Sequence, residues 1–407
     1  MGARVAAIMA VICVGGAAAC AAAVPPSSAP LVSEPSTEET PAVTDPAPTP
    51  VPSARPRQDL GAELDVRAMK HDLTGDVLEF ASDATGIIFS SNLAEDSGPE
   101  AAPDVWRYVP GPSAKPELAW RNPNRDHSVV KLGGDAGMMA FVDIPLTGER
   151  AWDLWLLPKV GAEPVLLDTH PGDEDVSSLV PSFSVYQPMV AWTAFDRGPN
   201  GPVSQLLTAE APDWTPQVIL ERPAWEAELW LPSLYGHMLV FTEVRYSADR
   251  STDERSVHLL DLLDPTAEPR RLDISGRATM PLLAGNTVLW KEAEPGFNMF
   301  NWGRMFRYDL LSGQVSSVSV WPQEYVNYPS VGSRFVAWWG ADGFSFGVFD
   351  LVRDRARLIE RYSNASQANV LRPHVAGDLM VWEYVDSSKP ETYRELRWAS
   401  LPNPRDD

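Results

Sequence analysis

Short apolar runs, separated by a glycine and a polar residue, recur along the second half of the chain. Residues 280–293 read MPLLAGNTVLWKEA, and residues 372–385 read RPHVAGDLMVWEYV. The runs are short, partly alternating and rich in aliphatic and aromatic residues, which is typical of β-strands. The Gly-Asn and Gly-Asp pairs at their centres supply the positive φ angles of a tight turn. The pattern therefore predicts a strand, a turn and a second strand in each segment.

The aromatic residue of the second strand recurs through most of the chain. It occurs seven times, at spacings of 52, 51, 49, 49, 48 and 44 residues: Phe89, Phe141, Trp192, Phe241, Trp290, Trp338 and Trp382. A proline lies nine residues before it in the last four copies, and a glycine lies near the middle of each of these copies. A period of about 48 residues indicates an array of similar supersecondary units.

Two further strands are predicted in each repeat. A third run follows a variable polar loop, as in VWRYVP (105–110) and MFRYDLL (305–311), and a weaker fourth run follows most of these, as in PVLLD (164–168) and ARLIE (356–360). Four antiparallel strands in a repeat of this length are typical of one β-propeller blade. No segment shows the periodicity of a convincing amphipathic helix, so we predict an all-β fold.

The predicted fold is a β-propeller of seven four-stranded blades within residues 58–407, with six blades plus an irregular strand as the alternative. We interpret the seven aromatic residues as core, each packing against the next blade where the sheets stack face to face. The last repeat ends after its third strand, at Leu401, while residues 62–73 alternate like a strand that has no neighbouring partner. We therefore predict that residues 62–73 complete the final blade.

The repeat resembles those of TolB-like and WD40-like propellers of bacterial surface proteins. The resemblance rests on the phrase P-x-x-x-G-x-x-V-x-W and on a following Tyr308-Asp309-Leu310 strand, with similar triplets at 260–262 and 349–351, and it covers residues 78–402. It implies a propeller of a bacterial envelope lipoprotein. The Ser-Pro-Asp-Gly turn typical of TolB repeats is missing, so the resemblance carries the fold rather than a TolB-specific role.

The first 57 residues predict export and tethering. Residues 1–20 contain an arginine, an apolar run too short to span a membrane, and small residues, which is the layout of a secretory signal peptide. The stretch AAAC (17–20) resembles a bacterial lipobox, with alanine where leucine is usual, and makes Cys20 the predicted lipidation site; cleavage of an ordinary signal after residue 19 or 23 is the alternative. Ten of the 37 residues from 21 to 57 are proline, so we predict a disordered tether there.

Charge and cysteine content narrow the range of partners. The formal net charge of −22 disfavours nucleic acid and anionic lipid headgroups, because both are negatively charged. We therefore predict no nucleic-acid partner and membrane contact only through the lipid anchor. Both cysteines, Cys13 and Cys20, lie in the first 20 residues, so the folded part can form neither a disulfide nor a thiolate metal site.

Motifs that would indicate catalysis or a cofactor are weak. The letters GFSFG (343–347) match G-x-S-x-G, but that motif requires a turn from a strand into a helix, and we expect Ser345 in a loop between two blade strands. No two histidines have metal-ligand spacing, and the acidic run 173–175 lacks the glycine and the alternation of a calcium loop. We predict no catalytic residue, no metal and no cofactor.

Aromatic residues in the predicted loops are the best candidates for ligand contact. Propeller ligands usually bind the face formed by the loops between successive blades and the loops that join second and third strands. These loops contain Trp225, Trp230, Trp302, Trp321, Tyr325 and Tyr328, with Phe297 and Phe300. His374 follows a proline on an innermost strand, where it can face the central channel. Exposed aromatic rings near acids and amides suit sugar stacking or peptide contact, and buttressing of blade edges is the alternative.

The sequence thus favours an exported, lipid-anchored propeller at the cell envelope: a binding or scaffolding protein that catalyses no reaction and has an envelope protein or a glycan as its partner. The functional alternative is a propeller lyase or hydrolase that acts on polysaccharide with carboxylates and His374 at the channel. Secretion without an anchor is the alternative localisation. The sequence leaves the ligand and the oligomeric state open.

Overall fold

The short alternating runs form antiparallel β-strands in every repeat. The structure is a computed structural model, and it describes residues 67–69, 79–91, 103–111, 114–124, 126–146, 151–172, 179–247, 253–264, 266–293, 303–318, 326–340, 345–361, 368–386, 388 and 393–401. The described residues form β-strands and no helix, as predicted. No helix in this part of the chain is long and apolar enough to cross a membrane.

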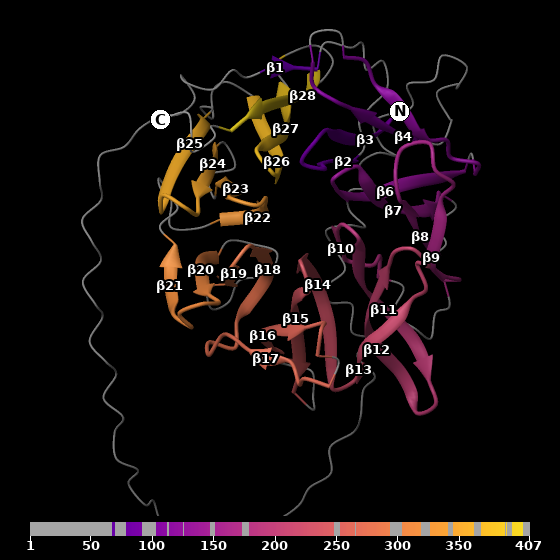
Figure 1. Cartoon of the computed structure of the whole chain (residues 1–407), viewed down its shortest axis with the longest axis vertical. Helices are drawn as coiled ribbons and strands as arrows, with labels where there is room; N and C mark the ends of the chain where they lie inside the picture. Colours follow the sequence, from indigo (N-terminus) through magenta and orange to yellow (C-terminus); the bar gives the residue numbers. More distant parts are fainter. Residues whose placement is uncertain are drawn as a thin grey trace, which may run out of the picture. The chain divides into compact units, whose positions relative to one another are not determined.

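The strands form seven four-stranded blades, which are arranged as a seven-bladed propeller (Figure 1). Blades 1 to 3 contain β2 (Glu79–Ser82), β3 (Ile87–Ser91), β4 (Asp104–Tyr108) and β5 (Glu117–Trp120); β6 (His127–Asp135), β7 (Met138–Pro145), β8 (Trp152–Leu157) and β9 (Val165–His170); and β10 (Phe183–Tyr186), β11 (Met189–Gly198), β12 (Gly201–Glu210) and β13 (Gln217–Pro223). Blades 4 and 5 contain β14 (Ala227–Tyr235), β15 (Met238–Tyr246), β16 (Asp253–Asp261) and β17 (Arg270–Arg271); and β18 (Ala278–Ala284), β19 (Thr287–Ala293), β20 (Gly303–Asp309) and β21 (Val315–Val318). Blades 6 and 7 contain β22 (Val326–Val331), β23 (Phe335–Gly340), β24 (Ser345–Asp350) and β25 (Arg355–Arg361); and β26 (Ala368–Ala376), β27 (Leu379–Asp386), β28 (Tyr393–Ser400) and β1 (Arg67–Ala68).

The N-terminal strand closes the ring. β1 pairs antiparallel with β28 through Arg67↔Trp398 and Ala68↔Arg397, and the Met69 N–H donates to the Leu396 carbonyl oxygen at 3.0 Å. This confirms, for residues 67–69, the prediction that the segment 62–73 completes the last blade; the rest of that segment lies outside the described residues. The seven-blade prediction is confirmed and the six-blade alternative is wrong.

The hydrophobic core is divided among the junctions between blades. The described residues form seven buried clusters, and each cluster joins two neighbouring blades, including blades 7 and 1. Each cluster contains one of the seven recurring aromatic residues, and all seven are almost completely buried. Their assignment to the core was correct, but each packs against the preceding blade rather than the next. Trp192 of blade 3, for example, belongs to one cluster with the blade 2 residues Leu154 and Leu167.

The recurring proline marks a bulge in the innermost strand. In blades 4 to 7 the pairing between the first and second strands shifts register opposite the core aromatic residue. The bulge consists of a residue with positive φ followed by the proline, and the four residues before proline are Leu231, Met280, Tyr328 and Arg372. A bulge suits proline because the unpaired residue needs no backbone N–H for the ladder. The sequence motif is thus a means of turning one side chain per blade away from the regular pleat.

The strand order defines two faces of the ring. Each innermost strand begins at the face formed by the connections between blades and by the loops that join second and third strands, here called the connector face. It ends at the opposite face, formed by the turns between first and second strands, here called the turn face. Both follow from antiparallel pairing within each blade.

Candidate functional site

The structure describes four of the nine aromatic and histidine positions predicted for ligand contact. Trp225 lies in the connection between β13 and β14, as expected, whereas Trp230 and Tyr328 belong to the innermost strands β14 and β22 rather than to loops. The loop assignment failed because the proline bulge interrupts the alternation of these strands and hides their first residues. His374 lies on the innermost strand β26, as predicted. The remaining predicted positions lie outside the described residues: Trp302, Trp321, Tyr325, Phe297 and Phe300.

Trp225 presents an exposed ring on the connector face. Its exposed fraction is 47%, which is high for a tryptophan. The ring lies over the backbone of Gly201, at the start of β12 in blade 3, so closely that a Cβ atom on this glycine would be 3.0 Å from the ring. Gly201 also has a φ of 122°, which disfavours any other residue. The glycine therefore provides the surface on which the exposed indole rests.

A carboxylate lies between two aromatic side chains at the start of blade 4. Both the Trp230 indole N–H and the Tyr246 hydroxyl donate hydrogen bonds to Oε2 of Glu228, each at 3.0 Å. Glu228 and Trp230 are on β14 and Tyr246 ends β15, so all three belong to the connector-face half of the blade. The two donors fix the carboxylate between ring edges, which is an arrangement that can contact the apolar face and the hydroxyl groups of a sugar.

Blade 6 adds a second aromatic pair. Tyr328, the residue with positive φ in the bulge of β22, is 41% exposed. Its ring stacks on Trp339 of β23, with centroids 6.4 Å apart and planes at 27°. The bulge thus holds a tyrosine ring at the inner ring of the propeller, supported from below by an indole.

Charged side chains of blades 7, 1 and 2 lie near one another, and the last of them contacts the backbone that leads into blade 3. Arg372 donates to Oε1 of Glu79 at 2.8 Å, and its second nitrogen lies 3.5 Å from Oε2 of Glu383. Lys131 of β6 donates to the carbonyl oxygens of Pro181 (2.9 Å) and Val180 (3.2 Å) in blade 3. Glu79, Lys131, Arg372 and Glu383 are called the inner charged cluster below.

Burial changes the protonation behaviour of this cluster. It raises the pKa of Glu79, although the neighbouring Arg372 charge opposes the change. It lowers the pKa of Lys131 to about 8, although Glu79 opposes this. The pKa of His374 is lowered to about 4, first by burial and second by the Arg372 charge. His374 is therefore neutral at neutral pH, and its ring packs edge-on against Phe80 of blade 1 at 5.5 Å.

The aromatic and charged groups lie at two adjacent levels of the ring. In blades 1, 2 and 4 they pair with the residue that follows the core aromatic: Glu79 with Ser90, Lys131 with Val142, and Trp230 with Thr242. Arg372 and Tyr328 lie in the bulges of blades 7 and 6, opposite the core aromatic residue itself. The inner ring therefore carries charged groups on blades 7, 1 and 2 and aromatic groups on blades 4 and 6.

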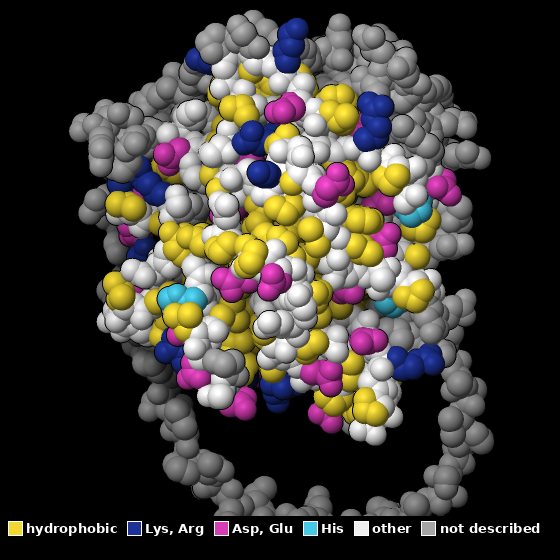
Figure 2. Space-filling model, turned by 45° about the vertical axis from the view of Figure 1, so that its right-hand side comes forward, with side chains coloured by type: hydrophobic (Ala, Val, Ile, Leu, Met, Phe, Trp, Pro, Cys, Tyr) yellow, Lys and Arg dark blue, Asp and Glu magenta, His cyan; other side chains and the backbone are white. Residues whose placement is uncertain are grey.

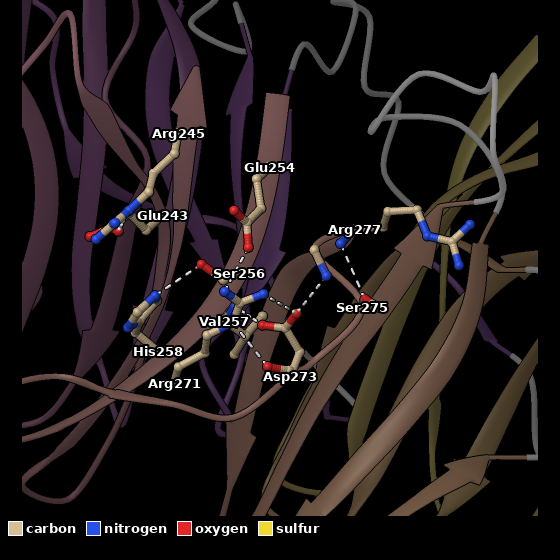
Figure 3. A network of polar contacts seen from close by, with 11 residues as sticks. Glu243, Arg245, Glu254, Ser256, Val257, His258, Arg271, Asp273, Ser275 and Arg277 are labelled. Carbon is tan, nitrogen blue, oxygen red and sulfur yellow. Dashed lines mark hydrogen bonds and ion pairs between the residues drawn. The ribbon is translucent and has the colours of Figure 1, made fainter. Parts of the chain in front are cut away.

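A second polar network lies on the outer strands of blade 4 (Figure 3). The buried Asp273 accepts a hydrogen bond from the Val257 backbone at 2.7 Å, and it also pairs with Arg271 at 3.5 Å. The same arginine binds Glu254 at 2.6 Å. These contacts join the connection leading to blade 5 with β16, and they give the network a structural role.

The network contains a serine and a histidine at the distance of a nucleophile and its base. Ser256 Oγ lies 2.9 Å from Nε2 of His258, but both side chains are buried, and the imidazole stacks on the core residue Phe241 at 5.5 Å. The nearby carboxylate of Glu243 is bound by Arg245 at 2.5 Å and by Arg222 at 3.4 Å. We interpret the Ser256–His258 pair as a core contact.

The other motifs with chemical meaning give no site among the described residues. Ser345 of the GFSFG match is the first residue of β24 rather than a loop residue, and it is followed by strand, so the helix that the motif requires is missing there. No group of three or more His, Cys, Asp or Glu side chains in the described part of the chain could hold a metal ion. Cys20 and the acidic run 173–175 lie outside the described residues.

Sequence reasoning missed most of the charged groups in the inner ring. Glu79, Lys131 and Glu383 follow no local motif, since their meeting depends on the closure of the ring. A local sequence signal does exist for Arg372, because this residue stands immediately before a recurring proline, as Tyr328 does.

No protein-family model matches the chain, and no curated protein sequence matches it. The propeller is similar to an oligogalacturonate lyase in complex with manganese (TM-score 0.54, 11% identity, 85% of this chain and 95% of that chain). It is also similar to the β-propeller domain of the Trilobed protease from Pyrococcus furiosus, described as having an open velcro topology (TM-score 0.53, 9% identity, 80% and 93%). A Pyrococcus horikoshii acylaminoacyl peptidase matches with TM-score 0.51 at 11% identity (81% and 52%). At these identities the likeness shows the propeller fold alone.

Proposed function

We propose that the chain is a binding protein that holds an oligosaccharide at the connector-face half of its inner ring. The observation that carries this proposal is the Glu228 carboxylate fixed between Trp230 and Tyr246, with the exposed Tyr328 ring two blades away. Aromatic rings pack on the apolar faces of sugars, and carboxylates accept hydrogen bonds from their hydroxyl groups. Figure 2 shows one face of the molecule, where hydrophobic side chains gather with acidic and basic side chains around them.

We further propose that this binding takes place at the cell envelope. The sequence supports an export signal, and lipidation of Cys20 would leave the Pro-rich segment 21–57 between the membrane and the propeller. A TolB-like envelope lipoprotein fits this organisation. Intact mass and fractionation of the protein from its host test this part: acyl mass on a chain that begins at Cys20 supports the anchor, and an unmodified soluble chain refutes it.

The binding proposal is tested with the full-length chain on an array of neutral and acidic oligosaccharides. We expect binding to a subset of glycans that Trp230→Ala and Tyr328→Ala weaken at least tenfold, about 1.4 kcal/mol. Leu263→Ser is the matched control, because this residue is 74% exposed in the turn between β16 and β17, at the turn face. Loss of binding in all three variants, or no glycan binding by a folded protein, would refute the proposal. Binding to envelope peptides alone would point to a protein partner instead.

A second candidate function is an enzyme that acts on polysaccharide as a lyase or hydrolase. The observation that favours it is the inner charged cluster, where Lys131 has a pKa of about 8 and lies near the carboxylate of Glu79. A lysine that is partly deprotonated near neutral pH can accept a proton from a substrate carbon or from water. The test is turnover of acidic polysaccharides, followed by the ultraviolet absorbance of unsaturated products and by reducing ends. No turnover by the wild-type chain, or unchanged turnover in Lys131→Met, refutes this candidate.

A further inference from the structure

The turn-face end of the inner ring has a composition of its own. Seven residues lie at the turn-face end of the innermost strands, each opposite the residue three positions before the core aromatic: Asp83, Asp135, Tyr186, Tyr235, Ala284, Gly332 and Ala376. Two of the seven are acidic, Asp83 and Asp135, and two are aromatic, Tyr186 and Tyr235. These four belong to the consecutive blades 1, 2, 3 and 4, and the other three are glycine or alanine. The level therefore combines two carboxylates with an aromatic wall.

Asp135 and the two tyrosines are in contact or face one another. The Tyr186 and Tyr235 rings meet with centroids 4.8 Å apart and planes at 45°. Asp135 faces blade 3, because its Oδ2 accepts a hydrogen bond from the Gln187 backbone, next to Tyr186, at 3.0 Å. The pKa of Tyr186 is raised by burial, by Tyr235 and by the charge of Asp135, which is consistent with their proximity. All three side chains are partly exposed, so solvent reaches them.

The charge of Asp135 is not matched by a cation from the described part of the chain. The neighbouring Asp83 is neutralised, since its carboxylate binds Arg107 at 2.9 Å and the turn amides of Thr85 and Gly86. Among the described residues, the carboxylate of Asp135 has one hydrogen-bond donor, the backbone N–H of Gln187. Burial raises the pKa of Asp135, and the carboxylate of Asp83 raises it further despite its pairing with Arg107, so a bound cation would stabilise the charged form of Asp135.

Two glycines bring this arrangement together. Gly133 and Gly134 precede Asp135 in β6, and a Cβ atom on either would lie 2.8 Å from a neighbouring side chain, Phe183 of blade 3 or Ile88 of blade 1. Their lack of side chains leaves room beside β6 for Ile88 of β3 in blade 1 and for Phe183 of β10 in blade 3. Asp135 is thereby held next to the aromatic wall rather than at the tip of a loose turn.

We propose that the turn-face end of the inner ring binds an organic ammonium group between the Asp135 carboxylate and the rings of Tyr186 and Tyr235. The carboxylate supplies the charge, and the aromatic faces attract the cation and cover its methyl or methylene groups. This site lies at the opposite end of the ring from the proposed oligosaccharide site and does not depend on it.

The experiment uses choline as the probe and dimethylbutanol, its neutral carbon isostere, as the matched ligand. Binding to the full-length chain is followed by ligand-observed NMR and by titration calorimetry. We expect choline to bind at least fivefold more tightly than dimethylbutanol, Asp135→Asn to abolish this preference, and Tyr186→Leu to weaken choline at least threefold. Asp213→Asn should leave binding unchanged, because this aspartate is exposed in the turn between β12 and β13. Equal binding of the two ligands, or equal loss in Asp135→Asn and Asp213→Asn, overturns the proposal.

Three further measurements distinguish binding at this site from misfolding of a variant and from general attraction of cations. Tyr186→Phe retains the ring and should retain choline binding, which separates a role of the aromatic face from a role of the hydroxyl. Thermal unfolding of each variant shows whether it is folded; if Tyr186→Leu is not, the Asp135→Asn result and the ligand comparison still decide. Raising the salt concentration weakens the general attraction of cations to this acidic protein. If the wild-type chain and every variant lose the preference for choline equally at high salt, the preference does not come from a defined site.

Discussion

Arg372 offers the sharpest test of the charge arrangement, because it joins the last blade to the first across 293 residues of sequence. Its exposed fraction is 27%, and that of Glu79 is 20%. Two opposite charges about 4 Å apart contribute about 4 kcal/mol at an effective dielectric constant of about 20. Partial exposure screens this value, so we expect Arg372→Met to lower the free energy of unfolding by about 2–3 kcal/mol. Methionine keeps most of the apolar stem, so the loss comes mainly from the guanidinium, which pairs with Glu79 and also lies over the Phe80 ring at 5.4 Å.

The assay is urea unfolding of wild type, Arg372→Met, Glu79→Gln and the double variant. Without the arginine, the pKa of Glu79, which burial already raises, should rise further above its unfolded value. Such a carboxyl stabilises the fold fully below its unfolded pKa, and this contribution is lost as the pH rises through the folded pKa. The effect of Arg372→Met should therefore be larger at about pH 8 than at about pH 5, and Glu79→Gln should recover part of it. An effect below about 0.5 kcal/mol, or one equal at both pH values with no recovery, would refute the reasoning.

Three more predictions concern the frame of the propeller, and each is measured as the free energy of unfolding in urea. Trp382→Ala should cost about 3–5 kcal/mol, because the indole is fully buried between blades 6 and 7; a loss below about 1 kcal/mol would contradict that packing. Gly377→Ala should cost more than Gly236→Ala, since both glycines have positive φ but only the first would bring a Cβ within 3.0 Å of Ala84; equal losses would show that the contact is unimportant. Ser233→Ala should cost about 1–3 kcal/mol, because the hydroxyl accepts a hydrogen bond from a buried backbone N–H of blade 5 at 3.0 Å; an unchanged midpoint would mean that water replaces it.

The fold could be predicted because its main signals are local and repeated. The aromatic residue of the second strand, the glycine turn and the third strand recur in register, so errors in one repeat are corrected by the others. Even the Tyr-Asp-Leu triplet has a local cause: Asp309 accepts hydrogen bonds from the backbone amides of Leu311 and Ser312 and so ends the third strand in a turn. The direction in which the aromatic residues face was not predictable, because alternation alone does not distinguish the two sides of a blade.

The candidate site could be predicted only in part, for a related reason. Trp225 and Trp230 were identified by residue type, but the groups that give them context are contributed by other strands and other blades. Glu79 and Arg372 stand near opposite ends of the folded chain, and no local pattern indicates that they meet. The Pro bulge was visible as a repeated letter, yet its geometric effect on Tyr328 depends on pairing with β23.

The two-residue strand β1 has a mechanical consequence. It forms the outer edge of blade 7, and its first residue, Arg67, pairs with Trp398 and lies over the indole at 5.4 Å. Among the described residues, two residue pairs and the hydrogen bond from the Met69 N–H hold β1 to β28, so a force that separates these two strands would act on few backbone contacts. The buried Met69 side chain adds resistance, because it belongs to the cluster that joins blades 7 and 1. Detachment of β1 would leave blade 7 with the three strands β26, β27 and β28.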